Sequence, residues 1–405
     1  MAGLTPMTRR GRLTLLLGAA TYVAAWLFGA TALYPVATGL VLAPLAASAW
    51  VRLSAAPMQL RRRAGKGTLL EGEDVWVTLD VRPGTRVPPP SLSVTERISR
   101  LGLRETPLRQ GRGSSRGTYV LERVARGRYA IEAARATVAD PFGLARATVD
   151  LDATGAMLVY PRLVALDRLF SESGAHAQDG RRLLLRRPTG FDLHSVREYE
   201  HGESLRKVHW PTTARRGQLM VKELEDAPRD EIAVVLDADA GAVSGESFDV
   251  QVRAAGSVLR AHAARGRRAV LAINSAHRPS ARVSSLDGEW AAALALLAEA
   301  EPNGDRPVVE LLAREGGPAA RAFETVVVTA RVTAALATKL VERALAGHGV
   351  SIVWVDAASF AGRPTKVEPE LLRLQAAGVA TAVVRRGDRL AAVLGAPAAA
   401  RSAHG

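Results

Sequence analysis

Residues 191–223, FDLHSVREYEHGESLRKVHWPTTARRGQLMVKE, hold charged and aromatic side chains at a density that no other part of this 405-residue chain reaches. The guanidinium group of arginine forms planar bidentate pairs with carboxylates and stacks on aromatic rings. A stretch of this kind is therefore typical of a buried ion-pair network or of a recognition surface. We expect a protein-binding or domain-junction site formed by Arg197, Glu198, Tyr199, Gly202, Glu203, Arg206, His209, Trp210, Arg215 and Lys222.

The local pattern of this stretch, which we place at residues 191–226, predicts two strands joined by a helical turn. Glycine marks the turns, and a serine provides a helix cap. The expected elements are a strand at 194–199, a turn at Gly202, a helical turn that Ser204 caps and Pro211 ends, and a strand at 218–224.

C-terminal to this stretch, residues 227–395 alternate between short apolar runs and helical patterns. Such runs are typical of buried parallel strands, and Gly347 and Gly378 stand where helices need a C-cap. The alternation predicts a doubly wound α/β sheet with any site at the carboxyl ends of its strands. The expected strands are 232–236, 269–273, 325–328, 352–355 and 379–384, and the expected helices are 248–264, 290–300, 332–346 and 368–377.

N-terminal to the stretch, residues 57–165 alternate apolar and polar side chains over short runs, as strands do. They predict an immunoglobulin-like β-sandwich that lacks the cysteine pair, because the chain has no cysteine. We expect Asp140–Leu144 to form a turn with Phe142 in the core. The expected strands are 73–81, 118–124, 129–138, 145–151 and 156–160.

Two segments carry no clear pattern of secondary structure. Residues 166–190 contain two arginine pairs, which predicts a solvated basic loop or, as an alternative, a docking surface for lipid headgroups or an acidic partner. Residues 396–405 are rich in alanine and are expected to form a disordered tail.

The N-terminal segment, residues 1–56, contains a run of 39 residues without a charge, Leu13–Val51. One membrane helix needs about 20 apolar residues, so the run predicts a transmembrane helical hairpin with spans near 13–30 and 33–51. Two alternatives remain open. One is a signal peptide cleaved near Ala30–Ala32, and the other is an apolar hairpin inside a soluble core.

The net charge of +14 is concentrated beside this apolar run. Residues 1–66 hold eight basic residues and no acidic one, whereas residues 191–405 hold 27 basic and 26 acidic residues. Membrane lipid is therefore an expected partner and nucleic acid is not. Because basic residues flank the run on both sides, we expect a multi-pass protein of the plasma membrane with its soluble domains in the cytoplasm.

The sequence carries few signs of catalysis. Ser195, Ser204 and His209 lie close together, but neither serine stands in a nucleophile elbow, and the chain has no P-loop or dinucleotide fingerprint. We expect no enzyme activity, no catalytic residue and no cofactor, and a metal-dependent binding or hydrolytic domain stays an alternative.

Several motifs stand at fixed spacings along the chain, namely Arg197-Glu198-Tyr199, Gly202-Glu203, Arg206, Val208, Trp210, Ala214-Arg215 and Leu219–Glu223, with Arg126-Gly127, Asp140–Leu144 and Tyr160-Pro161-Arg162 further upstream. In these motifs the chain resembles the bacterial "domain of unknown function 58" family. It departs from the family at Glu203, where Asp is more frequent, and at Pro211, where a basic residue is common.

The resemblance implies an α+β multidomain protein in which a membrane anchor and a β-rich region precede a von Willebrand factor A-like (Rossmann-type) α/β domain. It also implies a MoxR-type AAA ATPase as partner, with a transglutaminase-like membrane protein as a further candidate. We therefore expect a non-catalytic adaptor or scaffold at the cytoplasmic face of the membrane. The alternative is a cell-envelope assembly factor that acts without an ATPase.

A von Willebrand factor A-like domain would hold a divalent cation through an Asp-x-Ser-x-Ser motif and a later Thr and Asp. Here Asp237 is kept, Asp239 replaces the first serine, and Gly241 replaces the second. Thr329 and Ala330 stand where the later aspartate is expected. Since hard cations need oxygen ligands, we expect a degenerate site without metal, in which Asp237 caps a helix or joins the central arginine network.

Overall fold

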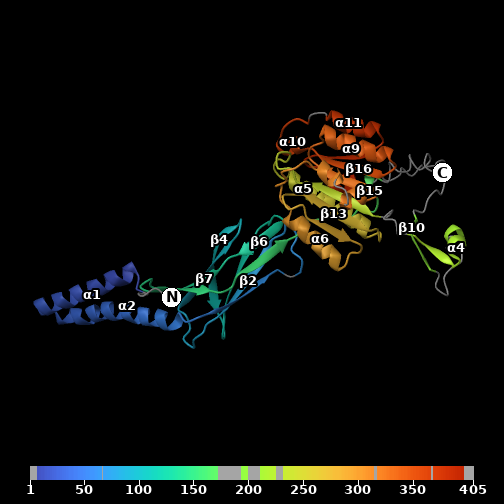
Figure 1. Ribbon diagram of the computed structural model, residues 1–405. Coiled ribbons are helices and arrows are strands. Elements are labelled where there is room, and N and C mark those ends of the chain that lie inside the picture. Colours follow the sequence, from blue (N-terminus) through green and yellow to red (C-terminus); the bar gives the residue numbers. More distant parts are fainter. Residues whose placement is uncertain are drawn as a thin grey trace, which may run out of the picture. The chain divides into compact units, whose positions relative to one another are not determined.

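The computed structural model describes residues 7–65, 67–171, 193–198, 210–224, 231–313, 317–365 and 368–395. The chain divides into two compact units, Met1–Tyr160 and Pro161–Gly405 (Figure 1). The predicted order of an apolar helix pair, a β-rich region and an α/β region is confirmed. Residues 396–405 and most of the basic segment 166–190 lie outside the described residues.

The first unit begins with two antiparallel helices, α1 (Arg9–Phe28) and α2 (Tyr34–Ser54). The side chain of Thr8 caps α1 by accepting a hydrogen bond from the Gly11 amide at 3.1 Å. Gly29 ends α1 in the left-handed conformation, with φ of 64°, and one 3₁₀ turn, Thr31–Leu33, leads into α2. Both helices extend beyond the predicted spans at the ends remote from this turn.

Small residues are prominent among the buried positions of the two helices. Gly11, Gly18 and Ala25 are buried on α1, and Ala37, Pro44 and Val51 are buried on α2. Each set repeats every seven residues, which keeps it on one face of its helix. A side chain at Gly18 would place its Cβ 2.9 Å from Leu40 Cβ, so glycine permits the close approach that membrane helices use.

The other faces of these helices are apolar and exposed. Both helices are long and apolar enough to cross a membrane. Apolar faces of this kind are stable in contact with lipid, whereas a helix of a water-soluble protein would bury them. The large exposed apolar side chains include Leu13, Leu16, Leu17, Trp26, Leu27 and Phe28 on α1 and Val36, Leu42, Leu45, Trp50 and Leu53 on α2.

The rest of the first unit is an antiparallel sheet of nine strands among the described residues, in the order β1-β2-β5-β4-β3-β6-β9, with β7 pairing to β3 and β8. Alternate residues of these strands point into one core, to which Ala47 and Val51 of α2 also belong. The strands are β1 (Gln59–Ala64), β2 (Val75–Arg82), β3 (Ser91–Ile98), β4 (Gly102–Gln110), β5 (Ser115–Leu121), β6 (Gly127–Ile131), β7 (Ala134–Ala139), β8 (Arg146–Leu151) and β9 (Gly155–Val159).

The second unit contains a six-stranded sheet in the order β14-β13-β12-β15-β16-β17, counted over the described residues. Its strands are parallel except β14, which is antiparallel to β13 at the edge. The five predicted strands are thus parallel as expected, and the antiparallel edge strand β14 was not predicted. The strands are β12 (Ile232–Asp237), β13 (Ala269–Asn274), β14 (Ser280–Val283), β15 (Glu324–Thr329), β16 (Gly349–Val355) and β17 (Ala380–Val384).

Helices cover both faces of this sheet and produce two cores. One core contains side chains of α5, α6 and α12, and the other contains side chains of α7, α8, α9 and α11. The bounds are α5 (Ser247–Ala263), α6 (Gly288–Glu299), α7 (Val309–Ala313), α8 (Pro318–Arg321), α9 (Ala334–Leu345), α10 (Ala357–Phe360), α11 (Pro369–Ala376) and α12 (Leu390–Leu394).

A separate antiparallel pair joins β10 (Leu193–Glu198) to β11 (Met220–Leu224), with α4 (Trp210–Arg216) between them in sequence. Pro211 lies in the first turn of α4, so the prediction that it ends a helix was wrong. Proline lacks an amide hydrogen, and the first helical turn does not need that donor.

Two further expectations were also wrong. Leu166 and Leu169 are buried in the core of the second unit, so the start of the basic segment is not a solvated loop. Phe142 does lie in a turn, but its side chain is 79% exposed rather than part of the core.

Candidate functional site

The strongest candidate site lies at the carboxyl ends of the parallel strands in the second unit. β12 and β15 are neighbours in the sheet, but β12 is followed by β13 on one side and β15 by β16 on the other, so the strand order reverses between them. Doubly wound sheets bind their ligands at such a topological switch point. The polar residues gathered there are Asp237, Asp239, Asn274, Thr329 and Arg331, which we call the switch-point cluster.

Asp237 is the buried centre of this cluster, with 4% of its surface exposed. Its Oδ2 accepts a hydrogen bond from Thr329 Oγ1 at 2.7 Å, and its Oδ1 accepts one from Asn274 Nδ2 at 3.2 Å. Burial raises the pKa of Asp237 above its usual value, and the two hydrogen bonds oppose that shift. Asp237 therefore joins the ends of three strands. It neither caps a helix nor bonds to an arginine of the central stretch within the described residues.

Arg331 and Asp239 form the outer part of the cluster. The distance between Arg331 Nη1 and Asp239 Oδ2 is 3.1 Å, and Arg331 Nη2 donates to the Gly241 carbonyl at 2.5 Å. Asp239 Oδ1 also accepts a hydrogen bond from the Gly241 amide at 2.8 Å. The arginine side chain is 49% exposed, so its charge faces both the aspartate and the solvent.

These contacts include both aspartates, Asp237 and Asp239, of the expected degenerate metal site. A guanidinium group supplies the positive charge beside Asp239. Over the residues that the structure describes, no three His, Asp or Glu side chains lie in position to hold a metal ion. Arg331 was absent from the sequence prediction, and its only signal was its place two residues after the end of a strand.

A cavity of about 400 Å³ opens beside Arg331. Its walls are held by local bonds: Trp354 Nε1 donates to the Ala330 carbonyl at 3.2 Å, and the buried carboxylate of Asp356 accepts the Ala358 amide at 3.1 Å and the Thr365 hydroxyl. The lining residues are Gly241, Ala242, Ala330, Arg331, Trp354, Asp356, Ala357, Ala358, Arg363, Pro364 and Glu368. Two guanidinium groups beside an indole ring suit a carboxylate-bearing ligand.

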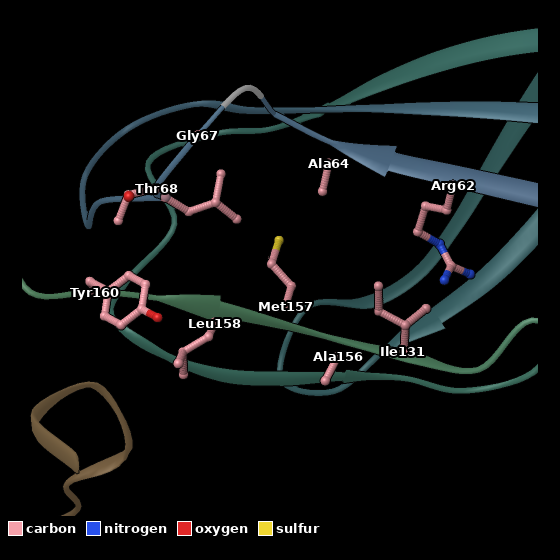
Figure 2. A pocket seen from close by; sticks show the side chains of 11 residues that line it. Arg62, Ala64, Gly67, Thr68, Ile131, Ala156, Met157, Leu158 and Tyr160 are labelled. Atoms are coloured by element: carbon pink, nitrogen blue, oxygen red, sulfur yellow. The ribbon is translucent and has the colours of Figure 1, made fainter. Parts of the chain in front are cut away.

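The first unit contains a second hollow, of about 360 Å³, shown in Figure 2. Arg62 lies at one end and Tyr160 at the other, with Met157 between them. Arg62 is already paired, because its Nε donates to the buried Glu96 at 3.0 Å. Tyr119 also donates to Glu96 at 2.9 Å, and burial together with this carboxylate raises the pKa of its hydroxyl. The polar groups of this hollow thus hold the sheet together, and it is the weaker candidate.

The predicted motif of residues 191–226 can be placed only in part. Tyr199, Gly202, Glu203, Arg206 and His209 lie outside the described residues. Arg197, Glu198 and Lys222 lie on paired strands, where Arg197 is opposite Val221 and Glu198 is opposite Met220. Trp210 and Arg215 lie on α4 and are exposed, Trp210 at 63%. The role of these residues as a binding or junction motif stays a prediction.

Comparison with known sequences finds one curated relative, the uncharacterized protein YeaD of Bacillus subtilis (strain 168), with 27% identity over 223 residues. The match covers 53% of this chain and 54% of the relative, so the chain spans about half the length of the curated relative that it matches.

Solved structures resemble parts of the chain at low scores. The CARDB domain of a Pyrococcus furiosus protein has a TM-score of 0.16 and 16% identity, and covers 23% of this chain and 84% of its own. Cwp6 from Clostridium difficile has a TM-score of 0.16 and 8% identity, with coverages of 82% and 38%. These scores are too low to assign a fold.

A family profile matches residues 195–359, a range that begins in β10 and ends in α10. Every residue of the switch-point cluster falls within it. The motifs of the central stretch and this match agree, and residues 195–359 match the family described as "Protein of unknown function DUF58".

Proposed function

We propose that this protein is a membrane-anchored, non-catalytic adaptor that binds a partner protein through the switch-point cluster. The observation that carries the proposal is the arrangement around Arg331. Its guanidinium is fixed by Asp239 and Gly241 and borders a cavity at the position where doubly wound sheets bind ligands. A fixed, half-exposed arginine is a favourable anchor for a protein partner.

The α/β unit is proposed to be von Willebrand factor A-like in a form that does not need a cation. Its six strands, numbered in chain order from β12, follow the order 3-2-1-4-5-6, the classic doubly wound order. Arg331 takes the role that a cation would have beside Asp239. A partner carboxylate would then pair with Arg331 or Arg363 directly, without a metal bridge.

The proposed partner is a MoxR-type AAA ATPase, as the family resemblance implies, and the soluble units are proposed to face the cytoplasm. The basic residues on both flanks of the helix pair support this orientation, since such flanks are retained on the cytoplasmic side. Fusing alkaline phosphatase after Gly405 tests it. An inactive fusion is expected, and an active one would place the units on the other side of the membrane.

The partner is tested by affinity purification of the full chain from detergent extract, with bound proteins identified by mass spectrometry. We expect the wild type to retain a MoxR-type ATPase in a nucleotide-dependent manner, and Arg331→Glu to lose most of it because the charge at the cavity is reversed. The matched control is Arg282→Glu. Arg282 is also exposed and pairs with an acid, Glu231, but at the amino edge of the sheet.

Equal retention by wild type and Arg331→Glu would contradict the cluster as the binding site. Retention of envelope proteins with no ATPase among them would favour the alternative function, an assembly factor that acts without an ATPase.

A further inference from the structure

Phe142 is an apolar residue of the first unit whose side chain is exposed. It lies in the turn of residues 140–144, between β7 and β8, and 79% of its surface is exposed. The buried carboxylate of Asp140 fixes this turn by accepting the amides of Phe142 at 2.8 Å and Ala145 at 2.5 Å. The side chain is therefore presented by a rigid turn and not by a loose one.

The same turn is bonded to the beginning of α1. Thr8 Oγ1 donates to the Gly143 carbonyl at 2.6 Å, and the Thr8 amide donates to the Leu144 carbonyl at 2.8 Å. A Cβ at Gly11 would lie 2.2 Å from the Leu144 carbonyl oxygen, so the helix backbone passes directly over the turn. Residues 143 and 144 thus lie beside the first helical turn of α1, just before the uncharged run that begins at Leu13.

The end of α2 reaches the β-sheet at the same boundary. Val51 is buried in the core of the sheet, and Trp50 Nε1 donates to the Pro88 carbonyl at 3.0 Å while its ring stays partly exposed. Tryptophan is typical of the water interface of a membrane. Arg9, Arg10 and Arg12 surround the start of α1, and all three are exposed.

We propose that the turn of residues 140–144 is a second membrane contact, in which Phe142 enters the interface of an anionic bilayer beside these arginines. The inference rests on the proposed membrane anchoring and adds a contact from the β-sheet to it. Lipid is the occupant because the turn that carries the exposed phenylalanine is bonded to the start of α1, whose outer face is apolar, and lies beside cations that attract anionic headgroups. The contact would hold the sheet against the bilayer, so the anchor would not act as a free tether.

The chain has no cysteine, so one labelled position can be studied without background. Phe142→Cys is modified with a nitroxide in the full chain, reconstituted into vesicles of phosphatidylcholine and phosphatidylglycerol. The measurement is the ratio of label accessibility to oxygen, which concentrates in lipid, and to a water-soluble nickel chelate. The bonds that fix the turn use the backbone at 142 and the side chains of Asp140 and Thr8, so the substitution leaves them intact.

Leu103→Cys is the matched control. Leu103 is 61% exposed and apolar, and it pairs with Arg97 of β3. Ser91 of the same strand pairs with Ala139, next to the turn. Arg97 and Ser91 are six residues apart on β3, so Leu103 lies about 20 Å along the strand direction from Ala139, at 3.4 Å per residue. We expect an oxygen-to-nickel ratio at least threefold higher at 142 than at 103.

A ratio at 142 equal to that at 103 would overturn the inference. Leu16→Cys, on the exposed apolar face of α1, separates this failure from failure of the proposed anchoring. A label at 16 that reports lipid, with a label at 142 that reports water, contradicts only the contact of the turn. Labels at 16 and 142 that both report water contradict the membrane anchor itself and the inference with it.

Discussion

Thr329 shows how much the switch-point cluster depends on a single side chain. Its hydroxyl donates to the buried Asp237 carboxylate at 2.7 Å and connects β15 to β12. Thr329→Val removes this donor at nearly constant volume and leaves a buried carboxylate with fewer partners, a change that costs about 1–3 kcal/mol.

We therefore expect faster hydrogen exchange of the β12 and β15 amides in Thr329→Val, measured on the full chain in detergent. Thr381→Val is the control, because the Thr381 hydroxyl donates to the carbonyl of Val379, two residues away, at 3.1 Å. Equal protection in both variants would show that the cluster does not stabilise the sheet.

His262 is expected to make the stability of the α/β unit sensitive to acid. It is buried in α5, and burial, aided by Arg267 and Arg265, lowers its pKa from 6.5 to about 3. The unfolded chain therefore binds a proton below pH 6.5 that the folded chain does not bind until about pH 3. The contribution of His262 to the free energy of unfolding is present in full above pH 6.5. It is lost as the pH falls toward 3, by at most about 1.4 kcal/mol per pH unit.

His262→Leu is expected to flatten the dependence of urea unfolding on pH between 6.5 and 4. The exposed His277 gives the control, and His277→Leu should leave the slope of the wild type unchanged. A slope in His262→Leu as steep as that of the wild type would refute this assignment.

Single residues also show the limits of prediction from the sequence. Asp237 and Asp239 could be found because they follow an apolar strand, where sites of doubly wound sheets lie. Arg331 could not, because its pairing with Asp239 depends on how β12 and β15 come together 92 residues apart. Phe142 was assigned to the core from its apolarity, and apolarity does not show which way a turn presents its side chain.

Among the elements, α1 and α2 approach each other closely at Gly18, and the rings of Tyr22 and Tyr34 also meet across the pair with their centroids 5.2 Å apart. Gly18→Leu would force its side chain against Leu40 and Val41, whose nearest atoms lie 2.9 Å from the added Cβ. Overpacking of this kind costs about 1–3 kcal/mol. We expect a lower melting temperature of the full chain in detergent.

The matched control is Gly39→Leu in α2. A Cβ at Gly39 meets nothing within 4 Å, so its melting temperature should stay close to that of the wild type. Equal losses in both variants would mean that helix propensity, and not the packing of the pair, sets the stability.

The elements that the sequence predicted are those with a strong apolar period. Strands β12, β13, β15, β16 and β17 lie within a few residues of the predicted runs, because strands buried on both faces are continuously apolar. β4 was missed because most of its residues are exposed and carry no period. β14 was missed because it is a four-residue edge strand with one buried side chain.

For the whole molecule, the order of its parts follows from changes in hydropathy along the chain. An uncharged run gives the helix pair, alternation gives the antiparallel sheet, and short apolar runs between helical patterns give the α/β unit. The surface proposed to bind a partner does not follow in the same way. It depends on side chains from separate strands, and the most distinctive motif lies only partly within the described residues.

If the cavity beside Arg331 receives a partner protein, photocrosslinking in the native cells should capture that partner there. Benzoylphenylalanine replaces Glu368, which lines the cavity, or Arg282 at the opposite edge of the sheet. We expect a crosslink from position 368 to a MoxR-type ATPase and none from position 282. No adduct from 368, or the same adduct from both positions, would contradict it.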